Sequence, residues 1–181
     1  MKEITDNKNR LWTASRECAY LAVFVALTIA AQLCLAAVPG VEIVTVLFVS
    51  FAFSFGMRRG ALAATSFSLI RQLVFGFYPT VLILYLVYYN VLAVVFGGLG
   101  KKIKKPASSL WLVVLVACLC TICFSLLDNV ITILWYSYAP KAARAYVLAS
   151  FTVLVPQVVC TLVTVLLLFL PLQKAFYFVK R

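Results

Sequence analysis

Residues 109–135 read SLWLVVLVACLCTICFSLLDNVITILW, a run in which Asp128 is the only charged side chain. A helix needs about 20 predominantly apolar residues to cross the hydrocarbon core of a bilayer, so this stretch predicts a membrane-spanning helix. The whole chain has the same character, since 65% of its 181 residues are hydrophobic and 12% are charged. Soluble domains have about 25% charged residues. The composition therefore indicates an integral membrane protein.

Five further segments flank this stretch with the length and composition of spans, or nearly so. The second is short and the third is interrupted by Arg71 and Gln72. No linker can hold another domain, so we predict one all-α domain over residues 1–181, a compact bundle of six transmembrane helices. Residues 1–17 and 171–181 are predicted to be cytoplasmic tails, the first without a cleavable signal. The predicted spans are residues 18–38, 43–55, 61–77, 80–99, 109–135 and 147–170.

The charged residues predict the orientation of these spans. The chain has 16 Lys and Arg against 5 Asp and Glu, a net charge of +11. Thirteen of the 16 cations precede the first span, follow the sixth, or lie between spans two and three or four and five. Short cytoplasmic loops carry an excess of Lys and Arg. Both termini are therefore predicted to be cytoplasmic, and the charge is a topology signal that calls for no nucleic-acid partner.

Composition and motifs also exclude several classes of function. The chain has no histidine, which excludes histidine-based zinc sites, Ser-His or Cys-His pairs and haem ligation by histidine. It has no G-x-x-x-x-G-K-[ST] loop for ATP hydrolysis. Its six cysteines, Cys120 and Cys123 of a lone CxxC included, lie in apolar stretches, as is typical of small packing residues. We predict no metal, no cofactor and no enzymatic activity.

Polar side chains inside the predicted spans are the candidate functional residues. A charge at the bilayer centre costs about 2.5–3.5 kcal/mol on insertion scales, so such groups are usually functional. With the predicted orientation, these side chains lie in the outer half of their spans or near the midplane. Their positions predict a cavity that opens to the outside of the cell and is closed on the cytoplasmic side. The candidates are Glu42, Arg71, Asp128, Asn129 and Gln157, with Gln32, Gln72 and Asn90 at similar depths.

Aromatic residues surround the same region and complete the predicted site. Tyr85 and Tyr89 lie a turn or more below the outer boundary of span four, and Asp128 and Trp135 share one helical face. A few polar groups among aromatic rings are typical of small-molecule sites. The alternatives are an interfacial aromatic belt and a structural ion pair between Arg71 and Asp128. Asn129 and Gln157 could instead join helices, and Glu42 could favour a helix N-terminus.

Small residues recur every four positions along the first span, at Cys18, Ala22, Ala26, Ala30 and Cys34. This spacing forms a shallow groove along one helix face, where another helix can approach closely. The groove could serve packing inside the bundle or the docking of another subunit. A chain without an ATPase motif needs such a partner if it is to pump a substrate.

Three features together resemble a known family over essentially the whole chain. They are the six short spans with the Ala22–Ala26–Ala30 stripe, the sequence Pro39-Gly40-Val41-Glu42, and Gly56-Met57-Arg58-Arg59-Gly60 after the short second span. These resemble the substrate-binding S component of energy-coupling factor (ECF) transporters.

The resemblance implies a protein of the bacterial plasma membrane that captures a vitamin or related micronutrient. It implies a transmembrane coupling subunit and two ATP-binding cassette ATPases as partners, in addition to membrane lipid. The alanine stripe would meet the coupling subunit, against which the S component would topple to release substrate inside. The outer loop after span one and the outer halves of spans four to six would hold the substrate, whose identity the sequence leaves open.

Two other readings compete with this one. A stand-alone secondary carrier could use Arg71 and Asp128 as a coupling pair, although such carriers often have inverted repeats and none is evident here. An intramembrane enzyme is the third reading. It is disfavoured because histidine is absent and Asp128 has no second carboxylate within a span.

Overall fold

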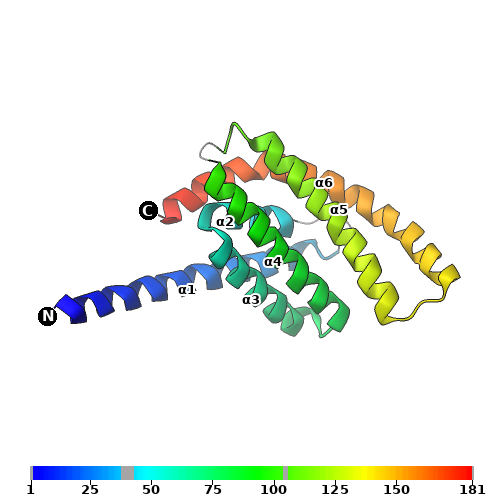
Figure 1. The fold of residues 1–181 in the computed structure, drawn as a ribbon, viewed down its shortest axis with the longest axis horizontal. Helices are drawn as coiled ribbons and strands as arrows, with labels where there is room; N and C mark the ends of the chain where they lie inside the picture. Colours follow the sequence, from blue (N-terminus) through cyan, green and yellow to red (C-terminus); the bar gives the residue numbers. More distant parts are fainter. Residues whose placement is uncertain (1, 38–42, 104–105, 181) are drawn as a thin grey trace.

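The computed structural model describes residues 2–37, 43–103 and 106–180, which form six α-helices and no strand (Figure 1). The predicted all-helical class is therefore confirmed for this part of the chain. The helices are α1 (Lys2–Leu35), α2 (Val44–Phe55), α3 (Met57–Phe75), α4 (Pro79–Lys102), α5 (Leu110–Trp135) and α6 (Pro140–Lys180).

Four of these helices are long and apolar enough to cross a membrane: Ser15–Leu35 within α1, α4, α5 and Pro140–Val179 within α6. This supports the prediction of a membrane protein. Helix α2 has 12 residues, or about 18 Å at 1.5 Å per residue, well short of a bilayer core of about 30 Å. Helix α3 has 19 residues but carries three arginines. By length and composition, four of the six predicted spans thus qualify.

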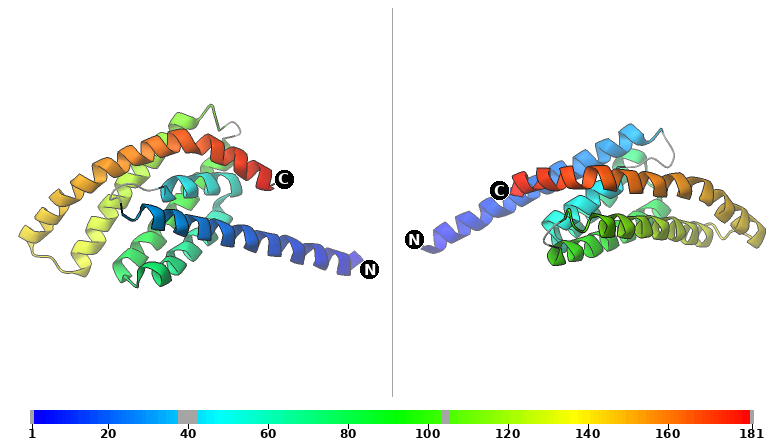
Figure 2. Two further views of the ribbon diagram at one scale, coloured as in Figure 1. Left: turned by 180° about the vertical axis from the view of Figure 1, so that it is seen from behind. Right: turned by 90° about the horizontal axis from the view of Figure 1, so that it is seen from above.

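The helices form two hairpins around a central short helix. Helices α3 and α4 pack antiparallel, as do α5 and α6, and α2 lies between α4 and α6 (Figures 1 and 2). Both chain ends lie toward the left of Figure 1. The turns joining α3 to α4 and α5 to α6 lie toward the bottom and the right of the view.

Two helices extend beyond the predicted boundaries. The segment predicted as an N-terminal tail is helical from Lys2, and the segment predicted as a C-terminal tail is helical to Lys180. Residues 2–17 contain no glycine or proline, so nothing in their backbone interrupts a helix. Helix α6 includes Pro156 and Pro171, and it is visibly arched in Figure 2, since proline removes a helix hydrogen bond and bends the axis.

The centre of the molecule is the aromatic packing around α2. Every residue from Val44 to Phe53 is buried, as expected for a helix that is apolar on all sides. Phe51 stacks on Phe24 of α1 with 4.0 Å between ring centroids, and Phe48 meets Phe67 of α3 at 5.2 Å. The predicted short second span is therefore a core helix enclosed by the other helices.

The junction between α2 and α3 depends on one glycine. Gly56 has a φ of +85°. This backbone conformation is energetically unfavourable for residues that have a Cβ atom, whereas glycine adopts it readily. Beyond this turn, α3 packs against both α2 and α4.

Candidate functional site

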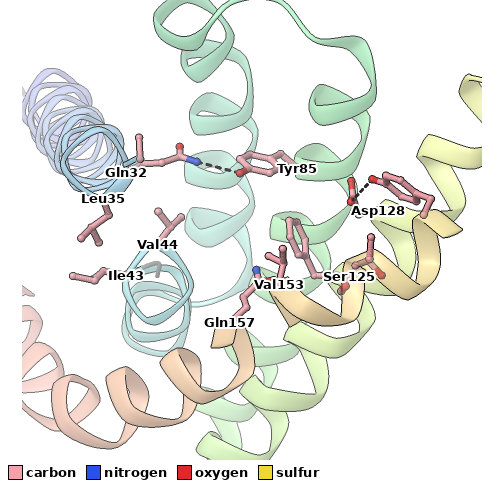
Figure 3. Close-up of a pocket in the computed structure, with 14 residues that line it drawn as sticks. Gln32, Leu35, Ile43, Val44, Tyr85, Ser125, Asp128, Val153 and Gln157 are labelled. Carbon is pink, nitrogen blue, oxygen red and sulfur yellow. Dashed lines mark hydrogen bonds between the residues drawn. The ribbon is translucent and has the colours of Figure 1, made fainter. Parts of the chain in front are cut away.

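A cavity of about 480 Å³ lies among α1, α4, α5, α6 and the start of α2 (Figure 3). Its wall combines aromatic rings, hydroxyl groups, two carboxamides and one carboxylate. Figure 3 shows Gln32 and Tyr85 joined by a hydrogen bond, with Asp128 and Ser125 on the side formed by α5. The lining residues are Gln32, Leu35, Ala36, Ile43, Val44, Tyr85, Phe124, Ser125, Asp128, Tyr146, Ala149, Ser150, Val153 and Gln157.

One face of α6 supplies much of the wall. Its lining residues fall at positions 146, 149, 150, 153 and 157, a spacing that keeps side chains on one helical face. Gln157 was predicted from its depth, whereas Tyr146 was missed because the predicted span began at residue 147, and Ser150 was missed although it lies within that span. The same periodicity, read backward from Gln157, reaches both of them. Ser125 was also missed, although it precedes Asp128 by three positions on the same face.

Asp128 is the one charged residue among the described residues that line the cavity. Its carboxylate accepts a hydrogen bond from the Tyr146 hydroxyl at 3.4 Å, which bridges α5 and α6. Among the described side chains no Lys or Arg forms an ion pair with it, and the ion pair found joins Arg59 to Glu17. The structural ion pair of Arg71 with Asp128, given above as an alternative to a binding role, is therefore not seen in the described part of the chain.

Arg71 instead belongs to a network beside the cavity. Its Nε donates to Gln32 Oε1 at 3.1 Å, and Gln32 Nε2 donates to the Tyr85 hydroxyl at 3.1 Å. The guanidinium carbon lies 4.6 Å from the ring centroids of both Phe75 and Tyr85, which is cation–π distance. Arg71 is thus a positioning residue for the two lining side chains Gln32 and Tyr85.

Three further predicted site residues are absent from the described cavity wall, and a fourth cannot be placed. Tyr89 is buried in the aromatic core, 4.6 Å from the Phe48 ring centroid, and Trp135 is 53% exposed. Asn129 is buried, and its Nδ2 donates to Ser150 Oγ at 2.9 Å, the interhelical role given as its alternative. Glu42 lies outside the described residues.

The network predicts a modest stability effect of Tyr85→Phe. This change removes the hydroxyl that accepts the Gln32 hydrogen bond, so we expect a loss of about 0.5–1.5 kcal/mol of unfolding free energy. The measurement is unfolding in a mild detergent. Tyr78→Phe is the matched control, because Tyr78 is 56% exposed and should change stability by less than about 0.5 kcal/mol. Equal losses in the two variants would contradict the network.

A second feature lies on α1, on a face separate from the cavity. The side chains of Cys18, Ala22, Ala26, Ala30 and Cys34 are exposed in the chain, while Phe24 and other residues of α1 face the core. Packing inside the bundle therefore does not account for the stripe. The three alanines line an apolar groove of about 640 Å³ that also includes Ser66 and Ile70 of α3.

Within the residues that the structure describes, no cluster of three or more Cys, Asp or Glu side chains is arranged to hold a metal ion. The six cysteines are free thiols. Protein-family models, curated proteins and solved structures were compared with the chain, and none matches.

Proposed function

We propose that this chain is the substrate-binding subunit of an ECF-type importer in a bacterial plasma membrane. In this proposal all six helices are embedded, both termini are cytoplasmic and the cavity faces outward. The subunit captures a vitamin or a related micronutrient and delivers it by toppling against a coupling subunit. The observation that carries the proposal is the cavity of about 480 Å³ enclosed by long apolar helices.

The wall of the cavity supports capture of a small organic molecule. Ligand sites typically occupy about 300–1,000 Å³ and combine apolar and aromatic surface with a few placed polar groups. Here Tyr85 and Phe124 supply rings, while Gln32, Asp128 and Gln157 supply polar groups. The arrangement suits binding and orientation of a ligand, and catalysis forms no part of the proposal.

The exposed groove on α1 supports an intramembrane partner. Small residues at every fourth position let a second helix approach closely in lipid, and Ala22, Ala26 and Ala30 line such a groove here. Since no ATP-binding loop is present, energy would come from partner subunits. A coupling subunit with two ATP-binding cassette ATPases supplies both the helix and the energy.

Uptake by reconstituted complexes tests the proposal. The chain would be expressed with a coupling subunit and two ATPases, and uptake of the ligand recovered from the purified chain would be followed in vesicles. We expect uptake only with ATP inside and none when the ATPases lack their P-loop lysine. Uptake by the chain alone under a proton gradient would contradict the proposal and favour a secondary carrier.

A further inference from the structure

The charge on the cavity wall is unbalanced. Asp128 contributes a carboxylate, and no Lys or Arg is among the described residues that line the cavity. The other polar lining groups are neutral carboxamides and hydroxyls, such as those of Gln157 and Ser150. The described wall therefore carries one formal negative charge without a balancing positive one.

The cations nearest in the sequence or the fold do not line the described cavity wall. Arg71 donates to Gln32, lies at cation–π distance from Phe75 and Tyr85, and has one buried guanidinium nitrogen without a hydrogen bond; it is not a lining residue. Lys141 and Arg144, on the first turns of α6, are exposed, and neither forms an ion pair with Asp128. The described side chains thus leave the carboxylate with the long Tyr146 hydrogen bond of 3.4 Å.

A carboxylate within membrane-spanning helices is costly unless it is paired, and such groups commonly mark the site of a charged ligand. A cationic ligand would supply the missing countercharge inside the cavity. The attraction would be stronger there than in water because the surroundings are less polar. Anionic ligands would meet like charge.

Aromatic rings lie beside the carboxylate. Phe124 precedes Asp128 by four positions, so the two side chains are neighbours on one face of α5, with about 5–6 Å between their Cβ atoms. Tyr85 faces the same cavity from α4, with its ring centroid 6.0 Å from that of Phe124. A ligand that contacts both the Asp128 carboxylate and these rings would have its positive charge and its own ring separated by roughly the rise of one helical turn, about 5.4 Å.

We infer that the cavity selects an organic cation in which an ammonium or similar group lies a few bonds from an aromatic or heteroaromatic ring, with Asp128 as its countercharge. This inference rests on the proposed function, whose substrate class it names. Gln32, Ser150 and Gln157 then offer hydrogen bonds to other polar groups of the ligand.

Three indole probes that differ in one terminal group test the inference. They are tryptamine, which is cationic, tryptophol, which is neutral, and indole-3-propionate, which is anionic. Binding to the purified chain, freed of its own ligand, would be measured by calorimetry. We expect tryptamine to bind at least about tenfold more tightly than the other two, because it alone can form an ion pair with Asp128. A tenfold difference in dissociation constant corresponds to about 1.4 kcal/mol of binding free energy.

Variants of the carboxylate complete the test. Asp128→Asn should lose at least about tenfold in tryptamine affinity without changing that for tryptophol, whereas Asp128→Glu should retain the preference for the cation. Glu17→Gln is the matched control, because it removes a carboxylate that pairs with Arg59 away from the cavity. Size-exclusion profiles and thermal unfolding establish that each variant is folded.

Several outcomes would overturn the inference. They are equal binding of the three probes, no binding of tryptamine at millimolar concentration, and unchanged tryptamine affinity in Asp128→Asn. A neutral or anionic ligand delivered by an ATP-driven complex would also overturn it, while leaving the proposed function intact. Cation binding that depends on Asp128, in a chain whose uptake needs no ATP, would support the inference and contradict the proposed function.

Discussion

Replacing Ala26 by tryptophan should reduce ATP-driven uptake to background while the purified subunit still binds its ligand. Ala26 is exposed and lines the apolar groove on α1, where close approach of a partner helix requires a small side chain. An indole at this position would hold the partner helix away along the middle of the groove. Ala26 is absent from the cavity wall, so ligand binding should be preserved. Uptake in vesicles and calorimetry on the isolated chain measure the two effects separately.

The neighbouring residue gives a matched control. Leu27 is 54% exposed on the same helix but does not line the groove. Leu27→Trp should therefore transport at close to the wild-type rate. If Ala26→Trp transports normally, or if both variants fail alike, the groove is not the docking face.

Gly100→Ala should strongly destabilise the fold through the junction of α2 with α3 and α4. A Cβ at this position would lie 2.1 Å from the carbonyl oxygen of Phe53, a backbone atom that cannot yield without moving α2. Overpacking of this kind costs about 1–3 kcal/mol, occasionally more. Gly97→Ala should behave similarly, because its Cβ would lie 2.5 Å from the backbone nitrogen of Met57. Thermal unfolding in mild detergent measures both losses.

Gly98 provides the control within the same helical turn. A Cβ there has no neighbour within 4 Å, and alanine is favoured over glycine in a helix by about 0.8–1.0 kcal/mol. Gly98→Ala should therefore be neutral or slightly stabilising. If all three substitutions had the same effect on unfolding, α4 would not pack against the junction as closely as the structure has it.

Hydrophobicity predicted the helical class and the approximate extent of the long apolar helix α5, which spans Leu110–Trp135. It did not predict the full lengths of α1 and α6. The first residues of α1 are mostly polar and carry little hydrophobic signal, whereas the C-terminal end of α6 is held by contacts with α2, such as the hydrogen bonds of Gln173 with Ser54 and Ser50. Hydrophobicity also gave α2 the role of a short span. A helix that is apolar on all sides can face either lipid or protein, and only the packing of its neighbours decides between them.

The positions of the cavity residues along their helices were easier to predict from the sequence than the directions of their side chains. Tyr85, Asp128 and Gln157 line the cavity, whereas Tyr89, one turn from Tyr85, is enclosed in the core. Depth follows from counting residues along a span, but the direction of each side chain depends on how the helices pack. The partner of Arg71 could not be predicted for the same reason, because Gln32 lies on another helix.

Mass spectrometry of the protein purified from its own membrane in mild detergent is the most direct test of the central claim, that the chain is a small-molecule capture subunit. Native spectra, followed by identification of what is released on denaturation, would show the occupant of the cavity. We expect one small organic molecule per chain, with an aromatic ring and a positive charge. Spectra that contain lipid alone, with no small molecule bound or recovered, would contradict the account.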